Sequence, residues 1–299
     1  MTTTAFVLSG GGSLGAVQVG MLQALGAHGV RPDLMIGTSV GAVNAAWVAG
    51  HGMSAASLAG LARIWSRLRR RDVFDVEAVR AVRALTARSP SLCSGRGLRN
   101  LLSTYAGVSR LDEASVPMHV VATDLLSGEE VLLSSGDLVA AVMASAAIPA
   151  VLPPVEIDGR HLVDGGVAHH TAVSQAVELG AQEIYVLPAG YPCALPSPPT
   201  SALGVAVHAL TLLIEQRLIG EVARYAGAAT IRVLPPLCPL AVSAADFGHG
   251  EHLVERGRLA SLEWLATGGV DLPEQERFLG LHDHAADATG GRRRDAVGR

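Results

Sequence analysis

The sequence predicts an α/β fold in which a mostly parallel central sheet carries helices on both of its faces. Short apolar segments of strand length alternate with helical patterns from residue 5 to about residue 267. The first two of these strands, at 4–9 and 33–37, each run into a glycine-rich turn that opens a helix. Strands connected through helices run parallel, and their sheet needs helical cover on both faces. No long low-complexity linker interrupts the pattern, so we expect one domain over residues 1–281.

The individual elements follow from local pattern. The strand at 4–9 is followed by a helix at 15–29, which ends at a glycine. The Asp158-Gly159 pair predicts a tight hairpin between short strands at 155–157 and 161–163. Further apolar runs of strand length occur at 117–125, 129–135, 183–189 and 229–236. Longer segments with helical character occur at 136–147, 203–226 and 251–267.

Residues 138–155 are uncharged over 18 positions, which a hydropathy scan would take for a membrane helix. Pro149, Pro153 and Pro154 argue against that interpretation. Proline removes a backbone donor and clashes with the preceding turn, so the helix should end near Ile148. We expect a buried helix followed by an extended loop.

Residues 51–110 lack strand patterns and predict a helical, arginine-rich insertion. Between residues 63 and 99, ten arginines accompany three acidic residues, which is a local formal charge of +7 in a chain of overall charge −4. Ile64, Trp65 and Leu68 lie among the arginines. The segment is therefore a candidate for peripheral contact with an anionic membrane, and a solvated helix face is the alternative.

The composition limits the classes of function open to the chain. An acidic overall balance argues against a general nucleic-acid binder. All 23 basic residues are arginine, which excludes Schiff-base chemistry on a lysine. Three widely spaced cysteines suggest neither a disulfide framework nor a zinc site, and the first residues do not resemble a secretory signal. We expect a cytoplasmic protein without metal or cofactor, and we expect residues 282–299, which are polar and glycine-rich, to be disordered.

Ser39 is the candidate nucleophile. It lies in GTSVG at 37–41, a G-x-S-x-G pattern typical of a serine on a sharp strand-to-helix turn. A serine before a helix also caps free backbone amides, so the pattern alone is weak. The apolar strand before Gly37 and the helix after Gly41 supply the context that a nucleophile elbow requires.

A second glycine-rich turn, GGGSLG at 10–15, is the candidate oxyanion hole. Amides at a helix start attract anions, which would also suit a phosphate. No Gly-Lys-Ser/Thr follows, however, and the spacing is not that of a dinucleotide-binding turn. Amides of Gly10, Gly11 and Gly12, with that of Val40, would instead stabilise the oxyanion of an acyl intermediate.

No histidine can be identified from the sequence as the base that would activate Ser39. An α/β-hydrolase places several strands before its elbow, and an acid and a histidine after it. Only one strand precedes the elbow strand here, and none of the 11 histidines has a distinctive setting. The sequence therefore points to another way of activating Ser39.

Three motifs in order resemble those of the patatin-like phospholipases, a family of lipid acyl hydrolases with bacterial members. These are GGGSLG at 10–15, GTSVG at 37–41 and DGG at 164–166, and the resemblance spans about residues 5–190. It implies a three-layer α/β sandwich, a Ser-Asp dyad of Ser39 and Asp164, no metal in the chemistry, and lipid acyl esters as substrates. The glycines that complete the motifs are Gly15, Gly37, Gly41, Gly165 and Gly166.

Asp164 has a structural alternative, because Asp-Gly is a common turn pair. Asp158 lies between two short strands as a hairpin turn should, whereas Asp164 ends a strand and leads toward a helix near Thr171. We predict that Asp158 is structural and that Asp164 is the general base. Partial burial should raise the pKa of Asp164 toward a useful range.

Two departures from the family pattern concern the substrate. Leu14 stands where many members carry arginine or lysine, and VAHHTAV at 167–173 replaces a stretch that often holds asparagines and a proline. Backbone amides survive a side-chain change, so the oxyanion hole need not be lost. Leu14, His169 and His170 are candidate substrate contacts, and solvent-facing histidines are the alternative.

The predicted function is a lipid acyl hydrolase of phospholipase, lysophospholipase or esterase type. An acyltransferase or thioesterase would use the same dyad with another acyl acceptor or leaving group. A non-catalytic lipid-binding module is the alternative outside enzymes. The expected partner is a lipid or acyl-ester substrate, with no nucleic acid, and the sequence specifies no oligomeric state.

Overall fold

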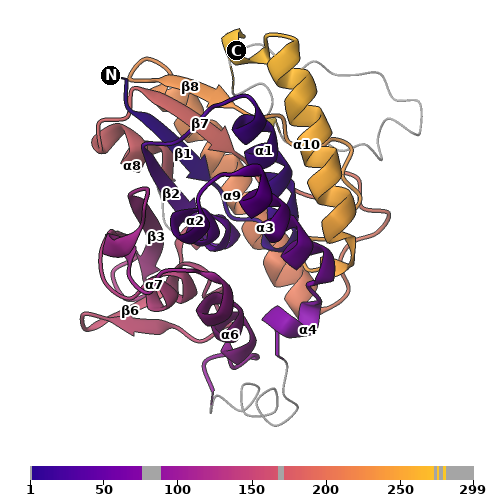
Figure 1. The fold of residues 1–299 in the computed structure, drawn as a ribbon. Helices are drawn as coiled ribbons and strands as arrows, with labels where there is room; N and C mark the ends of the chain where they lie inside the picture. Colours follow the sequence, from indigo (N-terminus) through magenta and orange to yellow (C-terminus); the bar gives the residue numbers. More distant parts are fainter. Residues whose placement is uncertain (1, 76–88, 168–171, 273–274, 276–278, 281–299) are drawn as a thin grey trace, which may run out of the picture.

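The strands that the structure describes form one sheet with a parallel centre and an antiparallel edge (Figure 1). The computed structural model describes residues 2–75, 89–167, 172–272, 275 and 279–280. The strands are β1 Thr4–Leu8, β2 Leu34–Thr38, β3 Met118–Asp124, β4 Glu130–Leu133, β5 Val155–Ile157, β6 Arg160–Asp164, β7 Glu183–Leu187 and β8 Thr230–Val233. Within the described residues their order is β5-β6-β3-β2-β1-β7-β8, with β4 paired to β3 outside this path. β3, β2, β1, β7 and β8 pair with one another in parallel. β4 and β6 pair antiparallel with β3, and β5 pairs antiparallel with β6.

Helices connect the parallel strands and cover the sheet (Figure 1). The α-helices are α1 Gly15–Ala27, α2 Val40–His51, α3 Ala55–Arg67, α4 Arg70–Val73, α6 Arg96–Tyr105, α7 Leu138–Ser145, α8 Ala172–Glu178, α9 Ala202–Tyr225 and α10 Gly250–Ala266. Short 3-10 turns are η1 Gly12–Leu14, η2 Leu111–Glu113, η3 Gly165–Val167, η4 Phe247–His249 and η5 Gly269–Asp271.

The alternation of side chains along β1 separates two hydrophobic clusters. Phe6 and Leu8 belong to a large cluster that also holds residues of α1, α2, α3, α6, α7 and α10. Ala5 and Val7 belong to a second cluster, with residues of α8 and of the C-terminal half of α9. Successive side chains of a strand point to opposite faces, so the two clusters lie on the two sides of the sheet. The predicted mostly parallel sheet with helices on both faces is confirmed.

The uncharged segment 138–155 begins with a buried helix, as predicted, but a hydrogen-bonded turn at 148–152 follows it where an extended loop was expected. Asp137 caps α7 by accepting a hydrogen bond from the Ala140 amide. The helix ends at Ser145, three residues before the predicted end near Ile148, and Ala146 is its C-cap residue. The predicted hairpin is also present, and both of its turn residues, Asp158 and Gly159, have positive φ.

The described part of the arginine-rich region is helical and packs against the core. α3 contacts both α1 and α10, and it buries Leu58, Leu61 and Trp65 in the large cluster. Its arginines, Arg63 and Arg67, are exposed. The region is thus part of the helical layer, with its charges turned outward. Residues 76–88 and the predicted tail at 282–299 lie outside the described residues.

Among the described helices, α9 alone is long and apolar enough, by length and composition, to cross a membrane. Its inner face carries Leu210, Ile214 and Leu218, which are buried in the two clusters. The helix therefore packs as part of the core.

The crossing of α1 and α10 is a direct contact between two helix backbones. A Cβ atom on Gly20 would lie 2.1 Å from the Val254 carbonyl oxygen, and one on Gly257 would lie 2.5 Å from the Val17 carbonyl oxygen. Because α1 starts directly after the glycine-rich turn at 10–14, this crossing fixes the position of that turn.

We expect Gly20→Ala to destabilise the protein by about 2 kcal/mol or more, because a methyl group cannot enter this contact unless α10 moves. Gly220→Ala is the matched control, since nothing lies within 4 Å of a Cβ atom at that exposed helix position. The control should be stabilised by up to about 1 kcal/mol, because alanine favours helix over glycine. Urea unfolding followed by circular dichroism measures both, and equal stability of the two variants would contradict the close contact.

Candidate active site

Ser39 and Asp164 are 125 residues apart, and they meet because two strands end at the same place on β3. The last residue of β2, Thr38, lies opposite Val121 in a parallel pair. The last residue of β6, Asp164, lies opposite Ala122 in an antiparallel pair. β4 occupies the other side of β3 at these positions, so β2 and β6 share one side and their ends adjoin.

Ser39 occupies a sharp turn between β2 and α2. Its backbone has φ 53° and ψ −123°, a region that residues other than glycine rarely adopt. A Cβ atom on Gly41 would lie 2.2 Å from the Leu8 carbonyl oxygen, and one on Gly37 would lie 2.5 Å from the Ala42 Cα. The two glycines of the GTSVG motif thus let the turn pack directly against β1 and α2.

The Ser39 hydroxyl donates a 2.7 Å hydrogen bond to Asp164 Oδ2. Ser39 is the N-cap residue of α2, yet its side chain makes no capping bond, so a simple helix cap does not describe it. Asp164 Oδ1 accepts a 2.8 Å hydrogen bond from the Gly166 amide. Ser39 is 5% exposed and Asp164 is 0% exposed, so hydroxyl and carboxylate face each other away from bulk water.

Burial raises the pKa of Asp164 to about 6 from an ordinary 3.8, and hydrogen bonds from Ser39 and Gly166 oppose the rise only in part. Such a carboxyl is mostly ionised at neutral pH but holds a proton more readily than an exposed aspartate. These are the properties required of a group that accepts a proton from a hydroxyl and later returns it. The upward direction expected from burial is confirmed.

Two buried hydroxyls that the sequence did not single out hold this pair in place. Ser145 accepts a 2.8 Å hydrogen bond from the Ser39 amide and donates one of 2.5 Å to the Val121 carbonyl. Thr123 donates a 2.9 Å hydrogen bond to the Asp164 carbonyl. The signal for Ser145 in the sequence was its position as the single polar residue of the uncharged run at 138–155.

A buried amide network supports the strand ends beneath the site. Gln18 Nε2 donates to the carbonyl oxygens of Ser9 and Leu187, at 2.8 and 2.9 Å. Asn44 Nδ2 donates to Gln18 Oε1, and Asn44 Oδ1 accepts from the Trp65 indole N–H. The signal in the sequence was an amide side chain flanked by apolar and small residues in each of two helices, AVQVG at 16–20 and AVNAA at 42–46.

The glycine-rich turn lies directly beside Ser39. A Cβ atom on Gly10 would be 3.2 Å from the Ser39 Cβ, and Gly12, with φ 58°, lines the same cavity as Ser39. Gly11 packs against Ala189. Val40, the first residue of α2, also lines this cavity.

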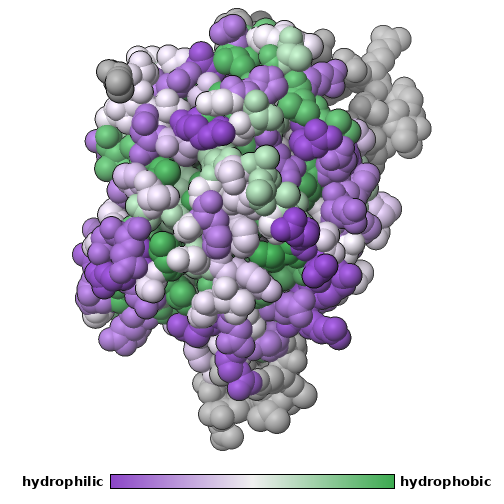
Figure 2. All heavy atoms as spheres, in the orientation of Figure 1, coloured by the Kyte–Doolittle hydropathy of each residue, from purple (hydrophilic) through white to green (hydrophobic). Residues whose placement is uncertain are grey.

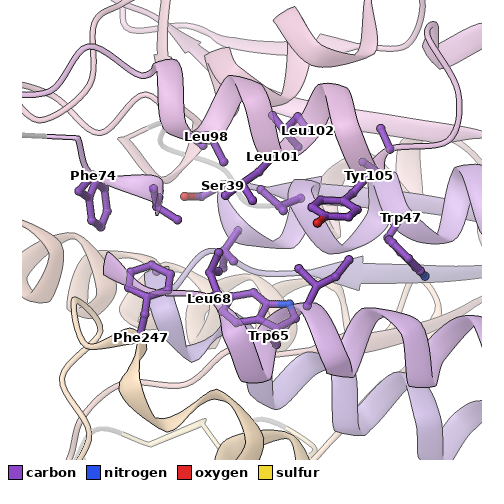
Figure 3. A pocket seen from close by; sticks show the side chains of 18 of the residues that line it. Ser39, Trp47, Trp65, Leu68, Phe74, Leu98, Leu101, Leu102, Tyr105 and Phe247 are labelled. Atoms are coloured by element: carbon purple, nitrogen blue, oxygen red, sulfur yellow. The ribbon is translucent and has the colours of Figure 1, made fainter. Parts of the chain in front are cut away.

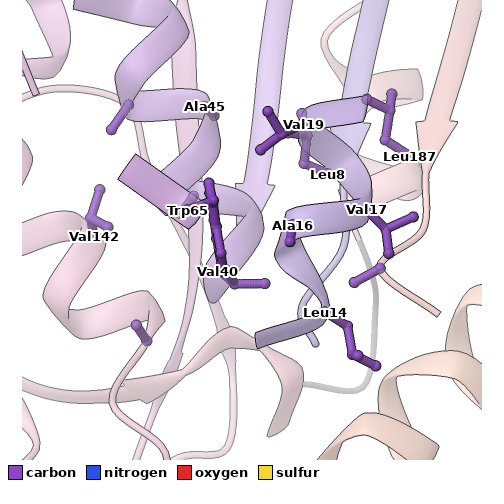
Figure 4. Close-up of a cluster of buried hydrophobic side chains, with 14 of the residues drawn as sticks. Leu8, Leu14, Ala16, Val17, Val19, Val40, Ala45, Trp65, Val142 and Leu187 are labelled. Carbon is purple, nitrogen blue, oxygen red and sulfur yellow. The ribbon is translucent and has the colours of Figure 1, made fainter. Parts of the chain in front are cut away.

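Of the three candidate substrate contacts, the structure describes only Leu14. Its side chain is 0% exposed and packs in the large core cluster below the turn (Figure 4). Leu14 therefore does not reach a substrate, and its expected role was wrong, because η1 turns the side chain at position 14 inward. His169 and His170 lie outside the described residues.

Ser39 lines an apolar cavity with a volume of about 100 Å³, and the cavity is partly open to solvent. Its walls come from α2, α3, α4, α6 and the segment after α7. In the view of Figure 3, Phe74 and Phe247 lie on one side of Ser39, and Tyr105 and Trp47 lie on the other. The inner faces of the arginine-rich helices thus form much of this cavity.

Metal ligands do not gather at this site in the described part of the chain. No group of three or more His, Cys, Asp or Glu side chains is placed there to hold a metal ion.

Comparison with known proteins assigns the chain to a family. A family model described as patatin-like phospholipase matches residues 6–177, which is more than half of the chain. The chain belongs to the patatin-like phospholipase family. Members of this family are usually lipid hydrolases, and the match contains the motifs at 10–15, 37–41 and 164–166.

Several proteins resemble this patatin-like chain in sequence or structure. An uncharacterized NTE family protein of Mycobacterium tuberculosis is 33% identical over 169 residues, which is 54% of this chain and 42% of that protein. Patatin-like phospholipase domain-containing protein 7 of Rattus norvegicus is 29% identical over 62% of this chain and 13% of its own length. VipD from Legionella pneumophila has a TM-score of 0.42 at 14% identity, covering 89% of this chain and 67% of VipD. The chain matches less than half the length of these two sequence relatives.

Asp164→Asn should make this patatin-like protein more stable at pH 8. Folding raises the pKa of Asp164, so between about pH 4 and 6 the native state holds a proton that the unfolded chain releases. Above about pH 6 the buried carboxylate is ionised, at a cost to folding of up to about 3 kcal/mol. Asparagine removes this cost, so we expect a gain of about 1–3 kcal/mol at pH 8 that shrinks toward zero near pH 4, measured by urea unfolding.

Ser39→Ala is the control for this measurement, because it keeps the carboxylate but removes one of its two hydrogen-bond donors. It should lower stability at pH 8 by about 1–3 kcal/mol. If Asp164→Asn were destabilised equally at both pH values, the raised pKa would be refuted.

Proposed function

We propose that this chain is a lipid acyl hydrolase in which Ser39 is the nucleophile and Asp164 is its general base. The observation that carries the proposal is the 2.7 Å hydrogen bond between the Ser39 hydroxyl and the buried Asp164 carboxylate, at the wall of an apolar cavity. A non-catalytic lipid-binding module would need no such contact. Membership of a family of lipid hydrolases supports the same reading.

The reaction follows from this geometry. As Ser39 Oγ attacks an ester carbonyl, its proton passes to Asp164 Oδ2, and the carbonyl oxygen becomes an oxyanion. Amides of the turn at 10–12 and of Val40 stabilise that charge. The protonated Asp164 then donates to the leaving alcohol, and water, activated in the same way, releases the acyl group as a carboxylic acid.

The cavity indicates the class of substrate. Its walls are mainly leucine, valine and aromatic side chains, which is the apolar lining typical of small-molecule sites. Such walls favour an acyl chain over a polar substrate, because burial of each methylene group contributes about 0.8 kcal/mol. Phospholipids, lysophospholipids and simple acyl esters all carry such an acyl chain.

The exposed arginines suggest where the enzyme works. Arg63, Arg67 and Arg99 lie on the outer surfaces of α3 and α6, whose inner faces line the cavity. We extend the proposal to peripheral contact of these charges with an anionic membrane, which would bring the cavity close to its lipids.

Ser39→Ala and Asp164→Asn should each reduce hydrolysis of a p-nitrophenyl acyl ester by at least about a thousandfold. Loss of both should resemble loss of either, because residues that act as one catalytic unit are strongly non-additive. Circular dichroism must show intact folds. His249→Ala is the control, and it should retain turnover. If it removed activity to the extent of Ser39→Ala, a histidine-based triad would replace the dyad.

The rate should also report the pKa of Asp164. Because the ionised carboxylate is the base, kcat/KM should be constant above about pH 7 and fall about tenfold per pH unit below pH 6. Stopped-flow or initial-rate assays on a soluble ester from pH 4.5 to 9 give the profile. A rate that stays constant down to pH 4.5 would exclude Asp164 as the base.

A further inference from the structure

A groove on the surface carries three consecutive arginines and lies next to the apolar cavity. We define this arginine groove by its lining residues, which are Arg69–Arg71, Pro199–Ser201, Gly204, Ser243 and Ala245–Gly248. It is open to solvent. Figure 2 shows hydrophilic residues gathered over the part of this face where Figure 1 places α4 and the end of α3.

The arginine groove has a positive balance of charge. Asp246 is its one acidic lining residue, and that carboxylate accepts a hydrogen bond from the Gly248 amide and lies 3.3 Å from His249 Nε2. Arg70 and Arg71 are exposed, and Arg71 reaches only to 4.0 Å from Asp72. Within the described residues Arg70 makes no ion pair. Two guanidinium groups are thus available to an anion from solution.

Polar groups of another element complete the groove opposite the arginines. Ser201 caps the start of α9, where its hydroxyl accepts a 3.0 Å hydrogen bond from the Gly204 amide. The positive end of this 24-residue helix therefore faces the same groove. Its field adds to that of the arginines.

The arginine groove and the cavity share a wall. Phe247 lines both, and it stacks on Trp65 with ring centroids 6.3 Å apart. The loop that lines the groove also binds the glycine-rich turn, because the Ser13 amide donates to the Ala244 carbonyl and its hydroxyl donates to the Ser243 carbonyl. An acyl chain on the Trp47 side of Ser39 would leave the rest of the substrate on the Phe247 side (Figure 3).

We propose that the arginine groove binds the negatively charged group of the substrate while its acyl chain lies in the cavity. This inference rests on the proposed function and makes it more specific. A phosphate monoester suits the groove, because guanidinium groups bind phosphate oxygens through charge-assisted hydrogen bonds. A trimethylammonium head group would instead meet like charge. The enzyme therefore prefers acyl lipids of net negative charge over zwitterionic ones.

The test compares lysophosphatidate with lysophosphatidylcholine of the same short acyl chain, each below its aggregation concentration. For the wild type, kcat/KM should favour lysophosphatidate by about tenfold or more. Arg70→Ser/Arg71→Ser should reduce this ratio about tenfold. Arg63→Ser/Arg99→Ser removes equal charge from outside the groove and should change the ratio less than about twofold. An unchanged ratio in the first variant, or an equal fall in both, overturns the proposal.

A binding arm separates this inference from the proposed function. An ether-linked lysophosphatidate cannot be hydrolysed, and calorimetry on Ser39→Ala should show that it binds about tenfold more weakly when Arg70 and Arg71 are replaced. If binding weakened in this way but the wild type hydrolysed no ester substrate, the proposed function would be refuted and anion binding by the arginine groove would be supported. Equal binding with and without the two arginines would refute anion binding by the arginine groove and would leave the proposed function unaffected.

Two further arms identify the source of the anion. Inorganic phosphate should bind at least about a hundredfold more weakly than the ether lipid, since it lacks the acyl chain. Equal affinities would assign the groove to free phosphate and overturn its role in the substrate. If Arg70→Ser/Arg71→Ser lost sedimentation with anionic vesicles but kept ether-lipid binding, the groove would be a membrane contact, which also overturns the proposal.

Discussion

The hydrogen bond between a buried hydroxyl and a buried carboxylate is the interaction on which the rest of the site depends. A carboxylate away from water is costly to ionise, and within the described residues Ser39 and Gly166 offset that cost with hydrogen bonds. The shift of the Asp164 pKa and the low exposure of the pair are therefore two results of one arrangement. The Ser39 side of the pair faces an apolar cavity, whereas Asp164 lies behind it and is fully buried.

β3 is the element that aligns this arrangement. It binds β2 and β6 along one side and β4 along the other, so the turn at Ser39 and the end at Asp164 are set by the register of a single strand. Ser145 and Thr123 bond directly to backbone atoms of the pair. The strained backbone of Ser39 is stable because strand ladders and these hydroxyls fix it from several sides.

The sequence predicted those features whose cause is local. The parallel strands, the Asp158-Gly159 hairpin and the turn at 37–41 each follow from a pattern within about ten residues. The contact of Ser39 with Asp164 was expected only through the order of family motifs, since strand pairing over 125 residues leaves no local trace. Leu14 was misjudged for a related reason, because a motif fixes the path of a turn but not which side chain it turns inward.

The arginine-rich helices show the same limit. Their charge was visible in the sequence, but not the packing of their apolar residues. Trp65 and Leu68 were weighed as membrane contacts, and they line the cavity beside Ser39 instead. Amphipathic periodicity reveals that a helix has two faces, and only the tertiary fold decides what each face touches.

The antiparallel position of β6 also affects when the pair forms during synthesis. A ribosome makes Ser39 and its turn 125 residues before Asp164, so the nascent chain carries a serine hydroxyl without its acceptor. Domains fold as their chains emerge, and contacts distant in sequence form late. The hydroxyl therefore lacks its carboxylate acceptor until β6 pairs with β3, so the Ser39–Asp164 contact is among the last parts of the site to form.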